Sequence, residues 1–268
     1  MLSAAMVQEI ITSPQNQFVQ EVRALLNQPK ARRKLQAFAA EGARLVEDGL
    51  RSGARARYVL VRAAHAPRVE SALSLRPDNL PILNVEDRLF DSLADTVTSQ
   101  GVLGVFDLPE WQLPDALNFA LILDQVRDPG NLGSILRSAE AAGAQAALLS
   151  PGTTDAFAPK VVRAGMGAHF RLPILHLDWE LMAVVLAGLN VYHADMDGEL
   201  SCWEADFRAP CALLIGGEAE GISPAATKLV TRSVRIPMAG GNESLNAAVS
   251  AGILLFEALR QRSEGKNL

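Results

Sequence analysis

The sequence predicts an α/β protein in which a smaller α/β domain precedes a domain with a mainly parallel β-sheet. In the second half of the chain, short continuous apolar runs alternate with helical patterns, which is typical of parallel strands covered on both faces. The first hundred residues alternate in a similar way on a smaller scale. Between them, the segment DLPEWQLPDALN contains two Leu-Pro pairs and no clear period, which indicates a linker.

The first part of the chain alternates amphipathic helical patterns with short strand-like runs. The helical periodicity predicts helices over residues 15–26, 42–51 and 68–75. The runs RYVLV and LPILNV, at 57–61 and 80–85, predict strands because they are rich in β-branched and aliphatic residues. We therefore expect a domain over residues 1–107, followed by a linker over 108–118.

The second part, residues 119–268, shows the alternation more clearly. Predicted strands are ALILD (120–124), AALLS (146–150), NVYHAD (190–195), CALLIG (211–216) and the segment SVRIP. A helix is predicted over 132–142, and a strongly apolar helix over 247–259. The sequence shows no internal repeat and no low-complexity segment.

Ligands of such sheets bind outside the carboxyl ends of the strands, so the loops that follow the strands predict the site. Three of these loops are rich in glycine and polar residues: DQVRDPGNLGSILRSAEAAG, GGEAEGIS and IPMAGGNESLN. In the third loop, Asn242, Glu243, Ser244 and Asn246 crowd the start of the apolar helix, although ordinary capping needs only one or two such residues. We therefore expect one site formed by the three loops.

Several classes of site are excluded by the motifs. No loop has the alternating glycines of a dinucleotide fingerprint, no Walker-type phosphate loop occurs, and no G-x-S-x-G hydrolase motif is present. Cys202 and Cys211 lack the spacing of a zinc site or a disulfide framework, and we expect both to be small buried side chains and the protein to be cytoplasmic. No apolar run is long enough to span a bilayer, so no membrane and no metal are expected.

The charge is unevenly distributed. The whole chain carries a net charge of −5, but residues 20–68 contain eleven Lys and Arg against four acidic residues, a net +7. From residue 117 onward, twelve basic residues face sixteen acidic ones. A basic first part suits a polyanion such as RNA, although a solvated helix face would give the same pattern.

The three loops together resemble the three signature motifs of the SpoU/TrmH family of RNA ribose 2′-O-methyltransferases, in the SPOUT superfamily. The matching segments are DQVRDPGNLGSILRSAEAAG, LLIGGEAEGIS and IPMAGGNESLNAAVSAGILLFEA, in the order and spacing of the family. Upstream, ITSPQNQFVQEVRALL, FAAEGARLVEDGL and TSQGVLGVF resemble the family's substrate-binding domain. The resemblance thus covers nearly the whole chain.

The resemblance implies a deep trefoil α/β knot in the C-terminal domain, an N-terminal domain like ribosomal protein L30e/L7Ae, and S-adenosylmethionine as cofactor. The residues that it places around the cofactor are Leu214, Ile215, Gly216, Gly217, Gly221, Ile236, Met238, Ser244, Leu245 and Asn246. The catalytic set that it implies is Asn131, Arg137, Glu218, Ser244 and Asn246. It also implies a homodimer through the C-terminal domain, in which the helix 247–259 is part of the interface.

Of the catalytic set, Arg137 is the main candidate, although a guanidinium rarely loses its proton. We therefore expect Arg137 to hold a phosphate and to stabilise developing alkoxide charge, and the identity of the general base stays open. Asn131 would orient Arg137 or the ribose. Simpler roles also stay open: Asn131 or Ser244 as a helix N-cap, and Glu218 as a residue that holds its own loop.

The expected substrate is structured RNA, most consistent with 23S-type ribosomal RNA because of the long N-terminal domain. A tRNA substrate, or a catalytically silent RNA-binding or ribosome-assembly protein, remains as an alternative. The RNA-binding candidates are Arg32, Arg33, Lys34, Arg44 and Arg137, with Arg127 and Arg163 as further ones. The target nucleotide, and whether naked RNA or an assembling particle is used, cannot be read from one chain.

Overall fold

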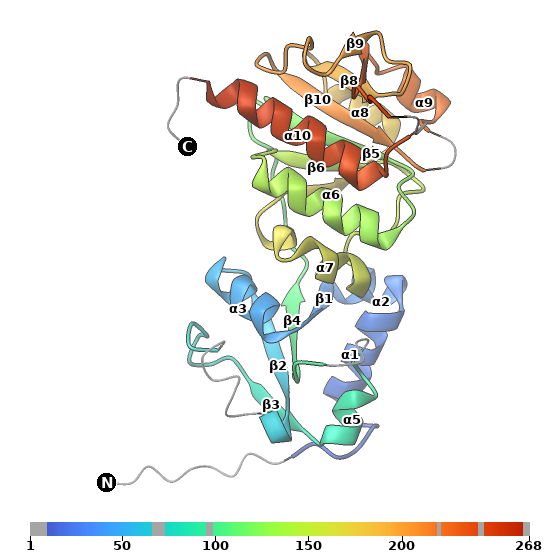
Figure 1. Ribbon diagram of the computed structural model, residues 1–268. Helices are drawn as coiled ribbons and strands as arrows, with labels where there is room; N and C mark the ends of the chain where they lie inside the picture. Colours follow the sequence, from blue (N-terminus) through green and yellow to red (C-terminus); the bar gives the residue numbers. More distant parts are fainter. Residues whose placement is uncertain (1–9, 66–72, 95–98, 219–220, 241–243, 265–268) are drawn as a thin grey trace. The chain divides into compact units, whose positions relative to one another are not determined.

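In the computed structural model, described for residues 10–65, 73–94, 99–218, 221–240 and 244–264, the chain forms two compact units. The first comprises residues 1–109 together with 157–163, and the second comprises 110–156 and 164–268. The boundary between residues 109 and 110 lies within the segment 108–118. Figure 1 shows the elements of each unit.

The first unit contains a four-stranded mixed sheet with helices on both faces. Its helices are α1 (Gln17–Asn27), α2 (Pro29–Leu35), α3 (Ala43–Arg51), a short 3-10 turn (Ala63–His65), α5 (Asp87–Asp91) and most of α7 (Pro159–Gly165). Its strands are β1 (Ala37–Glu41), β2 (Ala56–Arg62), β3 (Ile82–Val85) and β4 (Val102–Asp107), in the order β1-β4-β2-β3. β4 is antiparallel to both neighbours, and β2 and β3 are parallel.

One face of this sheet packs against α1 and α5. Val19, Val22 and Leu25 of α1, spaced three residues apart, are fully buried against the strands, as the amphipathic pattern predicts. The helix begins where the Asn16 side chain accepts a hydrogen bond from the backbone N–H of Phe18. The predicted helix 15–26 is thereby confirmed.

Segment 157–163 groups with the first unit by its contacts, although it lies within the range predicted for the second domain, 119–268. The Phe157 ring packs 5.0 Å from that of Phe38 on β1, and the Arg163 guanidinium lies 3.6 Å from the buried Glu41 carboxylate. An apolar ring and an arginine paired with a buried acid thus hold the segment on this sheet. The residue pattern within 157–163 does not indicate that the segment packs on this sheet, because the contacts are made with residues far away in the sequence.

The second unit is built on a seven-stranded sheet whose strands all pair in parallel. Its strands are β5 (Phe119–Asp124), β6 (Ala146–Leu149), β7 (Ile174–His176), β8 (Asn190–Ala194), β9 (Leu200–Ser201), β10 (Cys211–Gly216) and β11 (Arg232–Arg235). Its helices are α6 (Pro129–Ala141), a 3-10 turn (Ala168–Phe170), α8 (Trp179–Val185), α9 (Pro224–Thr227) and α10 (Ala247–Ser263). The strand order is β7-β6-β5-β10-β8-β11-β9. The predicted mainly parallel sheet is confirmed.

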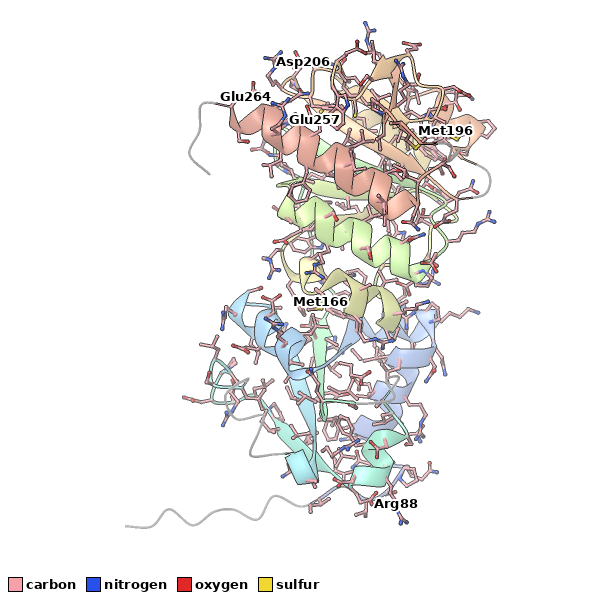
Figure 2. All side chains as sticks on the ribbon, in the orientation of Figure 1. Arg88, Met166, Met196, Asp206, Glu257 and Glu264 are labelled. Atoms are coloured by element: carbon pink, nitrogen blue, oxygen red, sulfur yellow. The ribbon has the colours of Figure 1, made fainter. Side chains whose placement is uncertain are left out.

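Helices cover both faces of this sheet. α8 and α9 contribute Met182, Leu186 and Ala226 to a buried cluster with Ile122 and Leu214 of the central strands. α6 and α10 lie side by side on the sheet (Figure 1). In Figure 2, Met196 lies at the end of the unit where α10 begins, and Glu264 lies at the opposite end of that helix.

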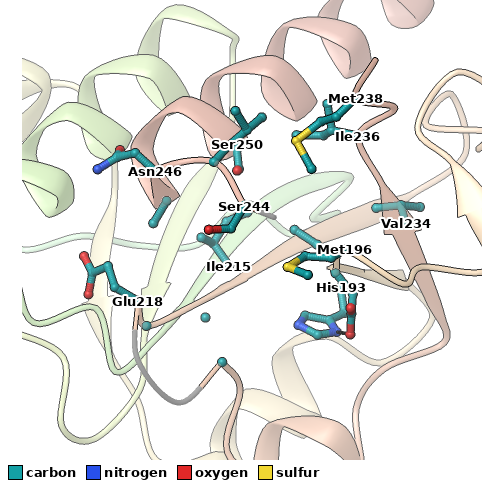
Figure 3. A pocket seen from close by; sticks show the side chains of 17 residues that line it. His193, Met196, Ile215, Glu218, Val234, Ile236, Met238, Ser244, Asn246 and Ser250 are labelled. Carbon is teal, nitrogen blue, oxygen red and sulfur yellow. Dashed lines mark ion pairs between the residues drawn. The ribbon is translucent and has the colours of Figure 1, made fainter. Parts of the chain in front are cut away.

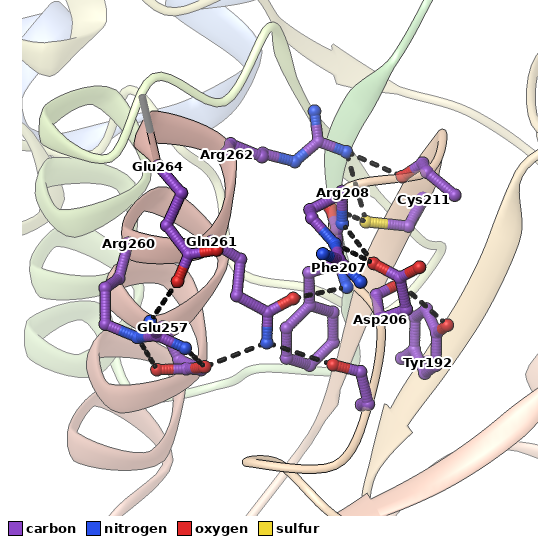
Figure 4. A network of polar contacts seen from close by, with 12 residues as sticks. Tyr192, Asp206, Phe207, Arg208, Cys211, Glu257, Arg260, Gln261, Arg262 and Glu264 are labelled. Atoms are coloured by element: carbon purple, nitrogen blue, oxygen red, sulfur yellow. Dashed lines mark hydrogen bonds and ion pairs between the residues drawn. The ribbon is translucent and has the colours of Figure 1, made fainter. Parts of the chain in front are cut away.

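The last turns of α10 are held by polar contacts with the segment between β9 and β10 (Figure 4). The Gln261 amide donates to the Ala205 carbonyl and accepts from the Phe207 N–H, at 3.0 and 2.8 Å. The Arg262 guanidinium donates to the Ala209 carbonyl at 2.8 Å and lies over the Phe119 ring. These contacts hold the far end of the helix whose first turn lies at the site.

Most of the predicted elements are present. The strands predicted in RYVLV, LPILNV, ALILD, AALLS, NVYHAD, CALLIG and SVRIP are observed, as are the helices predicted at 42–51, 132–142 and 247–259. The helix predicted at 68–75 falls mainly on residues 66–72, outside the described residues, and residues 73–75 form a turn. The loops expected to form the knot include residues 219–220 and 241–243, which also lie outside the described residues. Cys202 and Cys211 are both buried, as expected.

Candidate active site

A cavity of about 490 Å³ lies at the carboxyl ends of β8, β10 and β11, where the first turn of α10 closes it (Figure 3). Its lining residues come from the last residues of these three strands, from the loops after them and from that turn: His193, Ala194, Asp195, Met196, Ile215, Gly216, Gly217, Glu218, Gly221, Val234, Ile236, Met238, Ser244, Leu245, Asn246, Ala247 and Ser250. The size is that of a small-molecule site. The location agrees with the rule that parallel sheets bind ligands at this edge.

Three side chains from three different loops form one hydrogen-bonded chain beside the cavity. The Asn246 amide donates to the Asn131 carbonyl oxygen at 3.0 Å, and the Asn131 amide donates to the Glu218 carboxylate at 2.6 Å. Asn131 is separated from Glu218 by 87 residues and from Asn246 by 115. The three motif loops are therefore joined by their side chains.

The N-caps of α6 and α10 leave the side-chain amides of Asn131 and Asn246 free to form this hydrogen-bonded chain. α6 is capped by Asp128, which accepts from the Asn131 N–H at 2.7 Å, with Pro129 in the first turn. α10 is capped by Asn246, whose oxygen accepts from the N–H groups of Ala248 and Val249. Asn131 and Ser244 are therefore not N-caps, which removes the simpler role left open for each. The predicted turn residues Asn242 and Glu243 lie outside the described residues.

The loop after β10 needs glycine because backbone packs directly against it. A Cβ on Gly216 would lie 2.5 Å from the Gly221 carbonyl oxygen, and one on Gly217 would lie 2.6 Å from the Gln125 carbonyl oxygen. Gly217 and Gly221 exchange two backbone hydrogen bonds of 3.0 and 3.2 Å. The close approach keeps this wall of the cavity in main chain rather than in side chains.

A buried carboxylate, that of Asp124, is hydrogen-bonded to the end of the same loop. Asp124, the last residue of β5, is fully buried and accepts hydrogen bonds from the Ser150 hydroxyl at 2.7 Å and from the Ser223 N–H at 2.6 Å. Its charge is compensated by these donors. Asp124 thus fixes the segment that follows Gly221, although the sequence analysis did not single it out.

The cavity is acidic in character. Glu218 and Asp195 line it, and no Lys or Arg is among the lining residues that the structure describes. Burial lowers the pKa of His193, with Asp195 and Asp124 acting in the opposite direction. The His193 ring is therefore neutral near pH 7, and the cavity favours a cationic ligand.

Nine of the ten residues expected around the cofactor line this cavity: Ile215, Gly216, Gly217, Gly221, Ile236, Met238, Ser244, Leu245 and Asn246. Leu214 does not line the cavity, and a contact of its main chain with the cofactor stays a prediction. Its side chain is fully buried in the cluster with α8 and α9, because successive side chains along β10 alternate between the faces of the sheet. Ile215, one residue on, lines the cavity instead.

Arg137 does not join the network of Asn131, contrary to the expected orienting contact. It is exposed on α6 and does not line the cavity. Six residues along an α-helix place it about 120° around the axis from Asn131 and about 9 Å further along. The bonds of the Asn131 side chain run to Glu218 and Asn246 instead.

Among the RNA-binding candidates, Arg33, Lys34 and Arg44 are exposed, but the prediction for Arg32 is corrected. Arg32 is only 4% exposed, and its guanidinium donates to the Leu25 carbonyl at 2.5 Å. That carbonyl lies in the last turn of α1, where helix carbonyls lack partners within the helix.

Two further arginines were candidates for contacts with RNA. Arg163 is partly buried and paired with Glu41, so a structural role replaces the expected RNA contact. Arg127 is exposed and donates to the Gln125 side chain at 3.1 Å. Its role in RNA binding stays a prediction.

Sequence reasoning missed the wall contributed by the loop after β8. His193, Asp195 and Met196 line the cavity, as does Ser250 one turn into α10. The strand NVYHAD was predicted, and the rule that ligands bind beyond strand ends would have identified its last residues.

Within the described residues, no group of three or more His, Cys, Asp and Glu side chains could hold a metal ion. In the same part of the chain, no helix has the length and apolar character needed to cross a bilayer.

Comparison with known protein families gives two matches, one to each part of the chain. Residues 118–256 match the SpoU rRNA Methylase family, and residues 16–104 match the MRM3-like substrate binding domain. The first match contains Asn131, Arg137, Glu218, Ser244 and Asn246.

Individual relatives agree with these matches. The chain is 32% identical to "23S rRNA (guanosine(2553)-2′-O)-methyltransferase RlmP" of Bacillus subtilis, over 92% of this chain and 97% of that protein. It is also 32% identical to human "rRNA methyltransferase 3, mitochondrial", over 92% of this chain and 73% of that protein.

Two solved structures share the fold. The AdoMet-bound rRNA methyltransferase from Sinorhizobium meliloti has a TM-score of 0.80 at 34% identity, covering 94% of this chain and 97% of that one. The SpoU methyltransferase AviRb from Streptomyces viridochromogenes, in complex with AdoMet, has a TM-score of 0.83 at 31% identity, covering 92% and 98%.

Proposed function

The chain belongs to the SpoU rRNA methylase family, and from this premise we propose that it methylates a ribose 2′-hydroxyl of ribosomal RNA. It is an RNA methyltransferase that uses S-adenosylmethionine. The observation that carries the proposal is the hydrogen-bonded chain from Asn246 through Asn131 to Glu218, because it joins all three motif loops beside one cavity.

The cavity suits this cofactor on its own chemistry. Gly216 and Gly217 present main chain to the ligand, and a side chain on either would collide with neighbouring backbone. Asp195 and Glu218 give the cavity a negative character that suits a sulfonium cation. S-adenosylmethionine supplies a methyl group activated by its positive sulfur, and the chain's residues hold it and the acceptor.

We assign the residues of the network to orientation. The Glu218 carboxylate, held through one oxygen by Asn131, stands exposed at the cavity wall, where it can accept a hydrogen bond from the acceptor nucleotide. Fixing two reactants in one geometry supplies a large part of the rate enhancement of a transfer reaction. Arg137, permanently charged, would stabilise the developing alkoxide and hold the adjacent phosphate.

We propose further that the chain acts as a homodimer through α6 and α10. Val249 and Phe256 are 50% and 48% exposed and stand seven residues apart, on the same side of α10. Arg137 is exposed on the neighbouring helix and is directed away from the network of its own chain. A second copy docked on these helices would cover the apolar stripe and bring its Arg137 to the site.

RNA recognition is proposed for the first unit, which matches a substrate binding domain. Arg33, Lys34 and Arg44 are exposed cations on α2 and α3, available to phosphates. We also propose a cytoplasmic location, since Cys202 and Cys211 are buried free thiols, as a reducing compartment allows.

The test is transfer of tritium from labelled S-adenosylmethionine into RNA from a strain that lacks the gene. Incorporation into the ribosomal RNA fraction, followed by mapping of the new 2′-O-methyl position, is the expected result. Incorporation only into tRNA would replace the substrate. Absence of incorporation by a protein that binds the cofactor would favour the silent RNA-binding alternative.

A further inference from the structure

A polar pair, His193 and Asp195, lies at the end of β8 in the wall of the cavity. His193 Nδ1 lies 3.6 Å from Asp195 Oδ2 (Figure 3). The other Asp195 oxygen accepts a hydrogen bond from the Asp197 N–H at 3.0 Å. The imidazole is 13% exposed and the carboxylate 43%, so the Asp197 N–H holds one carboxylate oxygen while part of the group faces the opening.

The carboxylate of Asp195 has no cationic partner in the cavity. The neighbouring His193 is uncharged near neutral pH, since burial lowers its pKa. None of the described lining residues is Lys or Arg. Asp195 therefore presents charged acceptor lone pairs to whatever occupies the cavity, and it is matched best by a ligand that donates hydrogen bonds.

The order of the strands says which part of a ligand meets Asp195. The strands run β5-β10-β8-β11, about 4.8 Å apart. Glu218, with its asparagine partners, follows β10, and the apolar residues Ile236 and Met238 follow β11. Asp195 follows β8, between the two. The cavity thus passes from a polar end through Asp195 to an apolar end.

These three sections match the three parts of an adenosyl sulfonium compound. The methyl group should lie at the polar end, beside Glu218, which we assign to the acceptor nucleotide. A flat purine suits the apolar end, whose flexible Met238 side chain adapts to aromatic rings. The ribose then falls between them. Its 2′ and 3′ hydroxyls are hydrogen-bond donors, and carboxylates bind ribose hydroxyls in dinucleotide sites for the same reason.

We propose that Asp195 binds the ribose hydroxyls of the cofactor. This assignment rests on the proposed function, because it takes the cofactor as the occupant of the cavity. It makes Asp195 a determinant of specificity for a ribonucleoside over a deoxyribonucleoside.

The experiment is a binding cycle by calorimetry with the full chain. The probes are S-adenosylhomocysteine, its 2′-deoxy and 3′-deoxy analogues, and 5′-methylthioadenosine, which lacks the amino acid part. The variants are Asp195→Asn and, as a matched control, Asp197→Asn, which makes the same change two residues away on an exposed residue that does not line the cavity. Circular dichroism and thermal unfolding verify that each variant is folded.

The wild-type chain and Asp197→Asn should bind S-adenosylhomocysteine about tenfold or more tightly than at least one deoxy analogue. Asp195→Asn should lose a similar factor for S-adenosylhomocysteine and 5′-methylthioadenosine, and should no longer distinguish the deoxy analogue. An equal loss for the ribo and deoxy ligands would overturn the assignment. A loss confined to ligands with the amino acid part would overturn it as well, by placing Asp195 at the ammonium group. No binding of any ligand by the wild-type chain would overturn the proposed function itself.

Discussion

At the scale of single residues, Asn246 performs two tasks with the two ends of one amide. Its oxygen caps α10, and its nitrogen donates to Asn131. The start of the helix and the geometry of the site are thereby fixed by the same side chain. A replacement that caps equally well, Asn246→Asp, keeps the acceptor for the helix but loses the donor to Asn131.

Arg137 is predicted to affect turnover far more than binding. Arg137→Ala should lower the single-turnover rate by about 10²- to 10³-fold, the scale for loss of one electrostatic stabiliser of developing charge. Affinity for RNA should change little, because one phosphate contact among many is lost. Rates and dissociation constants measured on the same preparation test this. Arg208→Ala, which removes an exposed arginine paired with Asp206, is the control. A large loss of RNA affinity with an unchanged rate would contradict the assignment.

His169 should make stability depend on pH. The ring is fully buried beside the Ala156 carbonyl oxygen, 2.7 Å from Nε2, and burial lowers its pKa to about 4. Between about 6.5 and 4 the unfolded chain binds a proton that the folded chain does not, so stability falls as the pH falls through this window. The contribution approaches about 1.4 kcal/mol per pH unit. Denaturant unfolding at several pH values, compared with His169→Gln, measures it. Identical slopes for the two proteins would contradict it.

At the scale of elements, the short helix α2 combines a buried arginine with exposed basic side chains. The sequence KARRK predicted one basic cluster, but a seven-residue helix turns its side chains in different directions, and Arg32 points inward to the end of α1. Periodicity over so short a helix is too weak to show which arginine is buried. For the same reason the contacts of segment 157–163 with the first unit were not predicted, because a partner on another part of the chain leaves no local pattern.

The buried Arg32 and the exposed pair Arg33 and Lys34 are predicted to have different effects when they are replaced. Arg32→Ala should lower the free energy of unfolding by about 1.5–3 kcal/mol, the scale for hydrogen bonds from a charged group. The double change Arg33→Glu and Lys34→Glu should leave stability nearly unchanged. It should weaken RNA binding and reduce the slope of log affinity against log salt by roughly 1.5. Calorimetric unfolding and an RNA titration over salt test both. Normal RNA binding by the double variant across the titration would remove α2 from the RNA-binding surface.

The central strands were predictable because their own residues form a continuous apolar run. Runs such as ALILD and CALLIG must be buried on both faces, which is typical of central parallel strands. The position of the site followed from a second rule, that ligands bind at the carboxyl ends of parallel strands. What could not be predicted were contacts set by tertiary packing: the bracing of the Ser223 N–H by Asp124, the burial of Leu214, and the use of the loop after β8 as a wall.

At the scale of the whole molecule, charge and chemistry are divided between the units. The basic stretch of residues 20–68, with a net charge of +7, lies in the part that matches a substrate binding domain, whereas the acidic second unit holds the cavity. A negative cavity attracts the cationic cofactor, and a basic surface attracts RNA. The division lets each ligand be bound where the local potential favours it.

The proposed dimer can be tested through its site. If Arg137 acts in the site of the partner, a mixture of Arg137→Ala and Glu218→Ala chains, each inactive alone, should regain activity. Random exchange makes half of the dimers mixed, and each mixed dimer has one site with both residues intact, so roughly a quarter of all sites recover. If the site belongs to one chain, every site in the mixture lacks a residue and no activity returns. Phe256→Glu, which places a charge on the exposed stripe of α10, should give a monomer by light scattering and prevent the recovery, because no mixed dimer can form. A fully active monomer would show that one chain carries the complete site.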